Sequence, residues 1–143
     1  MLKWSHDARC TRHSRPLLFL MAAIVTPSFL WRTGAIYTFT GIMLGAFGAH
    51  GLSKRQGVLP AQIDSWRTAS HYVTINGVAL LAISQHPKFS THRFAGPAIA
   101  LGTALFSGSI YLLILNKEKF KFMGPVTPLG GVCLLAGYAT LAF

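Results

Sequence analysis

Four long apolar runs, separated by short charged segments, dominate the chain from residue 34 to residue 143. They cover residues 34–52, 61–84, 95–115 and 126–143. A helix of about 20 apolar residues reaches across the ~30 Å hydrocarbon core of a bilayer, and each run approaches or exceeds that length. The second run is the least apolar, because it contains His71, Thr74 and Asn76. The pattern predicts an all-α, polytopic integral membrane protein whose fold is a four-transmembrane-helix bundle.

The first 33 residues differ from the rest of the chain. Four basic residues precede an apolar run that Pro27 interrupts; they are Lys3, Arg9, Arg12 and Arg15. Three interpretations stay open: an Arg-rich, acid-poor mitochondrial transit peptide, a signal peptide or extra anchor, or an extension ahead of a start at Met21. We therefore divide the chain into a basic N-terminal extension at 1–33 and a four-helix membrane domain at 34–143.

Composition and charge favour a lipid environment. Hydrophobic residues make up 52% of the chain and charged residues 11%, whereas soluble domains carry about 25% charged residues. The net charge is +10, and the basic residues lie in the N-terminal segment and between the apolar runs. That placement indicates loops that face anionic headgroups. The lipid bilayer is thus the expected partner, and nucleic acid is not.

Four sequence patches resemble one known family. They are GAFGAHGL at 45–52, Trp66 with Thr68, Ala69 and Tyr72, FSGSIYLL at 106–113, and GPVTPLGG at 124–131. Together they are similar to the membrane proteins classed as domain of unknown function 423, which resemble transmembrane protein 256 of animals. The resemblance implies a four-helix membrane fold and no particular activity. The chain departs from the family where members commonly carry a histidine, because Asn76 stands there.

Small residues in the first run predict close helix packing. Gly41, Gly45 and Ala49 recur at every fourth position, which gives one helix face two consecutive small-xxx-small steps. Gly48 and Gly51 flank His50 near the end of the run. We expect this corner to fix the packing of the first two helices, with Trp66, Tyr72 or nearby backbone as partners of His50.

Several polar residues lie at membrane depth. Hydrogen bonds between helices are the favoured interpretation, and a solute path is the alternative; the residues are Asn76, Ser107, Ser109 and Tyr111. Thr127 before Pro128 predicts a helix N-cap. Neither these residues nor the histidines form a recognisable catalytic, cofactor-binding or metal site, so we expect no enzyme and no cofactor.

A structural, assembly or membrane-organising role is the favoured function, with contacts to other membrane proteins or to a second copy. A small oligomeric transporter or channel is the alternative. No acidic residue lies in the apolar core of a run, since Asp64 is near the start of the second run and Glu118 falls between the last two. Proton-coupled exchange commonly uses an acidic residue at membrane depth. The sequence leaves open whether the host is the plasma membrane or the mitochondrial inner membrane.

We predict that residues 1–20 are dispensable for folding and insertion, because the family resemblance begins only after them. A chain that begins at Met21 should insert into membranes and unfold in detergent at the same temperature as the full chain. Loss of the protein after this truncation would instead indicate a targeting role for the segment.

Overall fold

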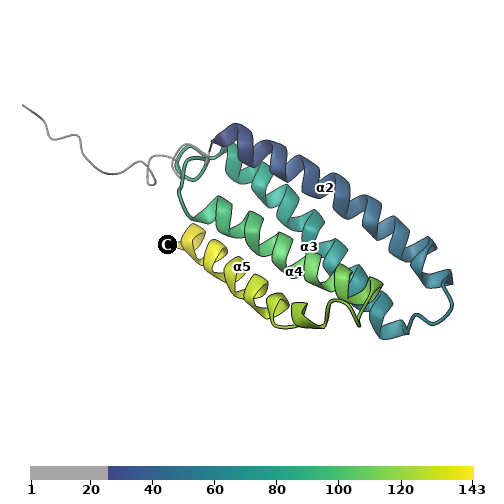
Figure 1. Cartoon of the computed structure of the whole chain (residues 1–143). Coiled ribbons are helices and arrows are strands. Elements are labelled where there is room, and N and C mark those ends of the chain that lie inside the picture. Colours follow the sequence, from purple (N-terminus) through teal and green to yellow (C-terminus); the bar gives the residue numbers. More distant parts are fainter. Residues whose placement is uncertain (1–25) are drawn as a thin grey trace, which may run out of the picture.

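The computed structural model describes residues 26–143, and this part of the chain is all-helical (Figure 1). Its four long helices are α2 (Pro27–His50), α3 (Pro60–Gln85), α4 (Ala95–Leu115) and α5 (Val126–Ala142). Short 3₁₀ turns, η1 (Leu52–Lys54) and η2 (Lys121–Met123), precede α3 and α5. The basic segment, Met21 and Cys10 lie outside the described residues.

The first helix begins at Pro27 rather than at the predicted Gly34. The hydroxyl of Thr26 accepts a hydrogen bond from the Phe29 backbone N–H at 3.1 Å, so Thr26 caps the helix. Proline is favoured at the first helical position because it lacks an N–H that would go unused there. Pro27 therefore starts the helix instead of interrupting it, and residues 27–33 are part of α2.

The other three helices match the predicted ranges closely. At the start of α3, the side-chain oxygen of Gln62 accepts the Leu59 backbone N–H at 2.9 Å, and Pro60 occupies the first position. The loop before it turns at Gly57, whose φ of 84° lies in the left-handed region that suits glycine. α4 spans the predicted residues, and α5 ends one residue before the C-terminus.

The helices form an open row rather than a closed bundle. α2 packs on α3, α3 on α4 and α4 on α5, whereas α2 and α5 share no substantial interface (Figure 1). The chain is thus two antiparallel hairpins joined through α3 and α4. The loops at 51–59 and 116–125 lie at one end, and the loop at 86–94 and the C-terminus lie at the other (Figure 1).

Glycines spaced by seven residues bring the α2 and α3 backbones together. Gly34, Gly41 and Gly48 are all buried and lie on one face of α2. A Cβ on Gly34 would lie 2.7 Å from the Gly77 carbonyl oxygen, and one on Gly41 would lie 2.8 Å from the Thr74 nitrogen. Such distances exclude a side chain, so only glycine permits this approach. A seven-residue repeat is the spacing of left-handed helix pairs.

A similar seam joins α4 to α5. A Cβ on Gly102 would lie 3.0 Å from the Gly130 carbonyl oxygen, and one on Gly130 would lie 3.0 Å from the Gly102 carbonyl oxygen. One heptad further along α5, a Cβ on Gly137 would lie 3.1 Å from the Ile99 nitrogen. Both hairpins are therefore held by direct contact between backbones.

The buried apolar core is small. One cluster of it consists of Leu30, Leu80, Ile83, Ile99, Ala100 and Leu134. Large apolar side chains lie instead on the outside, including Phe39 at 68% exposure and Leu135 at 73%. Three helical segments of the described part are long and apolar enough to cross a membrane; they are Pro27–Lys54, Ala95–Leu115 and Lys121–Ala142. Large apolar side chains on the outside and few on the inside are expected of a protein surrounded by lipid.

We predict that Gly130→Ala destabilises the protein by about 1–3 kcal/mol, the usual cost of forcing a group into a packed contact. The added methyl group would meet the backbone of Phe106. Gly131→Ala is the matched control, because its nearest neighbour would be the Phe106 ring at 3.9 Å. Thermal unfolding in detergent measures both, and equal unfolding temperatures would show that the seam is not tight.

Candidate functional site

Trp66 is the centre of the contacts between α2, α3 and α4. It is 2% exposed, and its indole N–H donates to the Leu44 carbonyl oxygen at 2.7 Å. Its ring lies 5.6 Å from that of Phe47 and 4.5 Å from that of Tyr111. Gly48 lies directly against the indole, since a Cβ there would approach Nε1 to 2.8 Å. The glycine makes room for the tryptophan, and the tryptophan fixes the α2 carbonyl.

Hydroxyl groups extend this centre from α3 to α4. Tyr111 donates to the Ser70 hydroxyl oxygen at 3.0 Å, and Ser70 donates in turn to the Trp66 carbonyl oxygen at 3.0 Å. Beside them, Ser107 donates to the Ala69 carbonyl oxygen at 3.0 Å. Buried polar groups in lipid need such partners, because no water is available to replace them. These bonds therefore hold the two hairpins together.

A further hydroxyl pair links α4 to α5. The hydroxyl oxygens of Ser109 and Thr127 lie 2.6 Å apart. The prediction of an N-cap at Thr127 is wrong, because Pro125 occupies the capping position and Thr127 is already inside the helix. Pro128 is exposed in the first turn of α5. Thr127 bonds across to α4 because its side chain faces that helix.

Tyrosines of the two outer helices, α2 and α5, form hydrogen bonds with the inner helices α4 and α3. Tyr37 of α2 donates to the Ala100 carbonyl oxygen at 2.9 Å, and Tyr138 of α5 donates to Asn76 Oδ1 at 2.6 Å. Asn76 is 2% exposed, and its Nδ2 has no hydrogen-bond partner within the described residues. The asparagine thus serves as an anchor for α5 on α3.

Not all of the residues predicted for the site meet at this centre. His50 is exposed at the last position of α2 and takes no part in the hydrogen bonds around Trp66. Gly51 follows as the helix C-cap, with its N–H bonded to the Phe47 carbonyl oxygen at 2.7 Å. Gly45 has room for a Cβ, which would lie 3.7 Å from the Ser70 Cβ. Tyr72 is 43% exposed, and its ring lies 5.0 Å from that of Phe106.

The tight glycines of α2 recur every seven residues, which was not predicted. The predicted face contains Gly41, Gly45 and Ala49, whereas the tight positions are Gly34, Gly41 and Gly48. The same spacing separates Gly130 from Gly137, and both are tight positions. A search for glycines at heptad spacing would have found these seams, because two crossing helices touch once every two turns.

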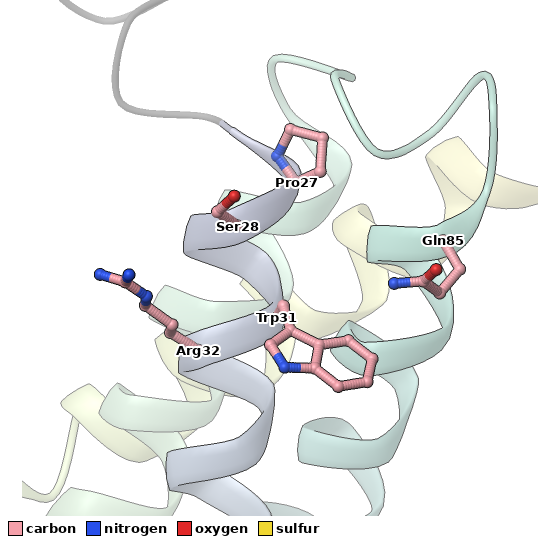
Figure 2. Close-up of a pocket in the computed structure, with 5 residues that line it drawn as sticks. All are labelled: Pro27, Ser28, Trp31, Arg32 and Gln85. Atoms are coloured by element: carbon pink, nitrogen blue, oxygen red, sulfur yellow. The ribbon is translucent and has the colours of Figure 1, made fainter.

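A cavity lies at the other end of the molecule. Its volume is about 300 Å³, and its lining consists of Pro27, Ser28, Trp31, Arg32 and Gln85. In Figure 2 the Trp31 ring and the Gln85 amide extend into the space between α2 and α3, and the Arg32 guanidinium extends away from it. A tryptophan beside a basic residue at a helix end is typical of the membrane interface.

Chemically, the site is a packing and hydrogen-bonding centre. Within residues 26–143, no group of three or more His, Cys, Asp or Glu side chains is placed to hold a metal ion. Its polar groups are hydroxyls, an amide and an indole that bond to helix backbones. Long apolar-faced helices held by glycines and buried hydroxyls define an integral α-helical membrane protein.

More particularly, the chain belongs to the family described as "Protein of unknown function (DUF423)", whose model matches residues 44–131. It is 38% identical over 115 residues to the UPF0382 membrane protein C1782.12c of Schizosaccharomyces pombe, covering 78% of this chain and 97% of that protein. It is 37% identical over 120 residues to the UPF0382 inner membrane protein YgdD of Escherichia coli K12, covering 82% and 88%. No solved structure matches the chain. The resemblance inferred from the four patches is confirmed.

We predict that Gly48→Leu lowers the unfolding temperature in detergent far more than His50→Gln does. The leucine would have to displace the Trp66 indole and its bond to Leu44, at a cost of several kcal/mol. His50 is exposed, so its replacement should change stability by less than about 0.5 kcal/mol. If His50→Gln proved the more damaging change, the centre of this corner would be the histidine.

Proposed function

We propose that this protein is a structural or assembly protein that crosses the membrane four times and associates with a second copy through the exposed face of α3. The proposal rests on one face of α3 that is exposed and partly polar. Lipid does not suit its polar groups, and no other part of the described chain covers it. The proposal has two parts, the number of spans and the partner of α3.

The packing of α3 supports four spans. α3 is less apolar than the other long helices, yet it has 26 residues and a length of about 39 Å. It contacts α2 from Gly34 beside Gly77 at one end to Gly48 beside Trp66 at the other. A helix that lies antiparallel along a spanning helix for its whole length must share its depth in the bilayer. α3 is therefore a span sheltered by its neighbours.

One face of α3 stays exposed at heptad spacing. Every member of this stripe is exposed; the residues are Asp64, Thr68, His71, Ile75, Val78 and Ala82. The intervals alternate between four and three residues, which is the spacing of a helix-packing seam. α2 and α5 expose large apolar side chains such as Phe39 and Leu135, which suit lipid. The α3 stripe is small and polar in its first half, which suits another helix.

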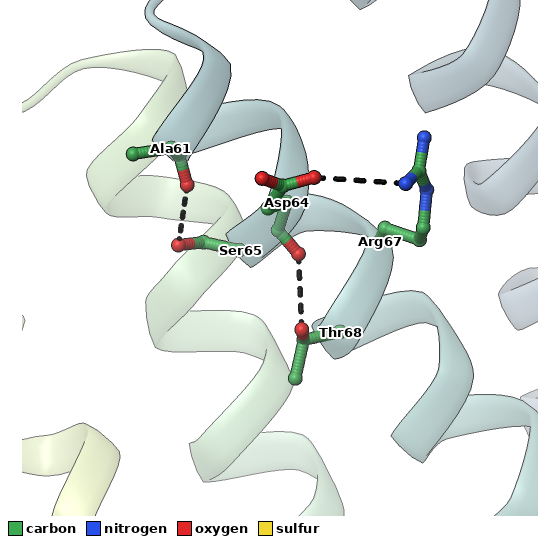
Figure 3. A network of polar contacts seen from close by, with 5 residues as sticks. All are labelled: Ala61, Asp64, Ser65, Arg67 and Thr68. Carbon is green, nitrogen blue, oxygen red and sulfur yellow. Dashed lines mark hydrogen bonds and ion pairs between the residues drawn. The ribbon is translucent and has the colours of Figure 1, made fainter.

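The polar groups of α3 differ in whether the chain itself satisfies them. Ser65 donates to the Ala61 carbonyl oxygen at 2.8 Å, and Thr68 donates to that of Asp64 at 3.0 Å (Figure 3). Arg67 lies 3.6 Å from Asp64 in an exposed ion pair (Figure 3).

Deeper along α3, the side chains of His71 and Tyr72 are exposed, and their ring centroids lie 6.5 Å apart. Polar groups at this depth gain by bonding to another chain.

A second copy fits this face because the face is complementary to itself. In a two-fold dimer whose axis follows the membrane normal, the two α3 helices run parallel and each residue meets its own counterpart in depth. A neutral imidazole carries one donor and one acceptor, so two His71 side chains can bond to each other. Asp64 and Arg67 offer opposite charges one turn apart, so each can pair with the other copy.

Cysteine cross-linking in native membranes tests this arrangement. Cys10 and Cys133 are first replaced by Ser, and Ile75→Cys is then introduced in the full chain. We expect oxidation to produce a disulfide-linked dimer at Ile75. Ile42→Cys on α2 is the matched control, because Ile42 is exposed to 62% and neighbours Gly41, which packs beside Thr74 at the same depth. It should remain monomeric.

Two outcomes would contradict the proposal. Equal cross-linking of both variants would indicate random collision, and no cross-linking of either would indicate a monomer or a different partner. Purification in mild detergent separates these cases: a stoichiometric second protein would favour a mixed assembly, and a bound small solute would favour transport.

A further inference from the structure

The loop between α4 and α5 combines exposed phenylalanine with lysine. Lysine and phenylalanine alternate over residues 119–122, and Phe122 is 68% exposed. The ring of the partly buried Phe120 lies 6.3 Å from that of Phe122 between centroids, and the Lys119 ammonium lies 5.9 Å from the Phe120 centroid. None of the three residues of η2, which contains Phe122, is buried. The loop therefore carries apolar surface and positive charge side by side on the outside of the molecule.

Hydrogen bonds within the loop give it a defined shape. Oδ1 of Asn116 accepts the Lys119 backbone N–H at 3.1 Å, and the Asn116 carbonyl oxygen accepts that of Phe120 at 3.2 Å. The Phe120 carbonyl oxygen in turn accepts the Met123 N–H at 2.9 Å. An asparagine that bonds to the backbone ahead of it is a common way to fix a turn. The two phenylalanines are thus held in place at the end of α4.

The length of α4 places this loop at the membrane surface. α4 has 21 residues, which reach about 31 Å, and the hydrocarbon core is ~30 Å thick. The helix ends at Leu115, so the residues that follow lie at the level of the lipid headgroups. Aromatic rings are favoured at this level, and a lysine there can keep its stem along apolar groups while its ammonium meets the headgroups.

The charge around the loop is strongly positive. The loops at 51–59 and 116–125 lie at the same end of the molecule (Figure 1). Together they carry one acidic side chain, Glu118, and five basic ones, which are Lys54, Arg55, Lys117, Lys119 and Lys121. Clusters of about four to eight basic residues beside a membrane span are typical of binding to anionic lipid headgroups.

The opposite end is less positive. Its described basic side chains are Arg32, Lys88 and Arg93, and the terminal carboxylate of Phe143 offsets part of their charge. The Arg32 guanidinium and the Lys88 ammonium therefore provide a comparison for the lysines of the α4–α5 loop, at the other surface of the same membrane.

We propose that the α4–α5 loop is a binding site for anionic phospholipid, in which Phe122 inserts among the lipids and Lys117, Lys119 and Lys121 contact their phosphates. Burial of an apolar ring and attraction between charges add to each other in binding to such lipids. The ends of α4 and α5 already fix the loop at the membrane surface, so lipid is the partner that its position favours. The site is independent of the α3 face and of the number of copies.

Lipid-dependent unfolding of the full chain in mild detergent tests the preference for anionic headgroups. Phosphatidylglycerol and phosphatidylcholine with the same acyl chains are compared, so that only the headgroup differs. Phosphatidylglycerol should raise the unfolding temperature more than phosphatidylcholine does, because a ligand that binds the folded state stabilises it. High salt should reduce the difference, because it screens exposed charges.

Glutamine substitutions locate the preference. Lys119→Gln with Lys121→Gln should weaken the binding of phosphatidylglycerol by about thirtyfold, the effect expected from two basic residues at a membrane surface. Arg32→Gln with Lys88→Gln is the matched control, because it removes the same charge at the opposite end. The control should bind phosphatidylglycerol as the parent does. Without added lipid, the loop variant should unfold at the parent's temperature, because both lysines are exposed.

Photo-cross-linking tests the contact of Phe122 with lipid. p-Benzoylphenylalanine replaces Phe122 in the full chain, which keeps an aromatic group there, and the protein is placed in vesicles of phosphatidylcholine with a minority of phosphatidylglycerol. Position 122 should cross-link phosphatidylglycerol beyond its share of the bilayer, and the two lysine substitutions should abolish the excess. Phe39 is the matched control, because it is also 68% exposed and lies within a span. It should cross-link both lipids in proportion to their amounts.

Three results would overturn the proposal. Cross-linking in bulk proportion at both positions would show that the loop does not select anionic lipid. Equal loss of phosphatidylglycerol binding in the two glutamine variants would assign the preference to overall charge. Cross-links from position 122 to a protein in native membranes, with none to lipid, would assign this surface to a protein partner.

Discussion

The close approach of helix backbones at glycine is the constraint on which the rest of this structure depends. In lipid, the hydrophobic effect does not draw apolar helices together, so their association relies on packing and on hydrogen bonds between helices. Gly34, Gly41 and Gly48 give α2 that contact with α3, and Gly102 and Gly130 give it to α4 and α5. Each hairpin is consequently a unit whose helices touch through their main chains.

The two hairpins are joined by a different kind of contact. Between α3 and α4 the links are side-chain hydrogen bonds, such as those of Ser107 and Tyr111, and the aromatic contact of Trp66. Such bonds are worth roughly 0.6 to 2 kcal/mol each in membranes. They are directional, so they set how one hairpin is rotated against the other. The arrangement of the two hairpins is therefore determined by a few side-chain groups.

α3 has a different set of contacts on each of its sides. One side carries the glycine and tryptophan contacts to α2, another the hydroxyl bonds to α4, and its third side is the exposed stripe proposed to meet a second copy. These contacts explain why it is the least apolar of the long helices: its buried residues, which include Ser70, Asn76 and Ser84, meet neighbouring helices instead of lipid. Its C-terminal end, at Gln85, leads into the loop to α4.

The sequence by itself determined the membrane class, the family and three of the four helix ranges almost to the residue. The length of an apolar run between charged segments matches the thickness of the bilayer, and that length can be read from consecutive residues. Tertiary structure decided which glycines are tight, why Thr127 bonds to Ser109 instead of capping α5, and that the helices form an open row. It also placed Trp66 over Gly48 and left His50 exposed. These features depend on how each helix is rotated about its axis against its neighbour, and that rotation is set by contacts between residues far apart in the sequence.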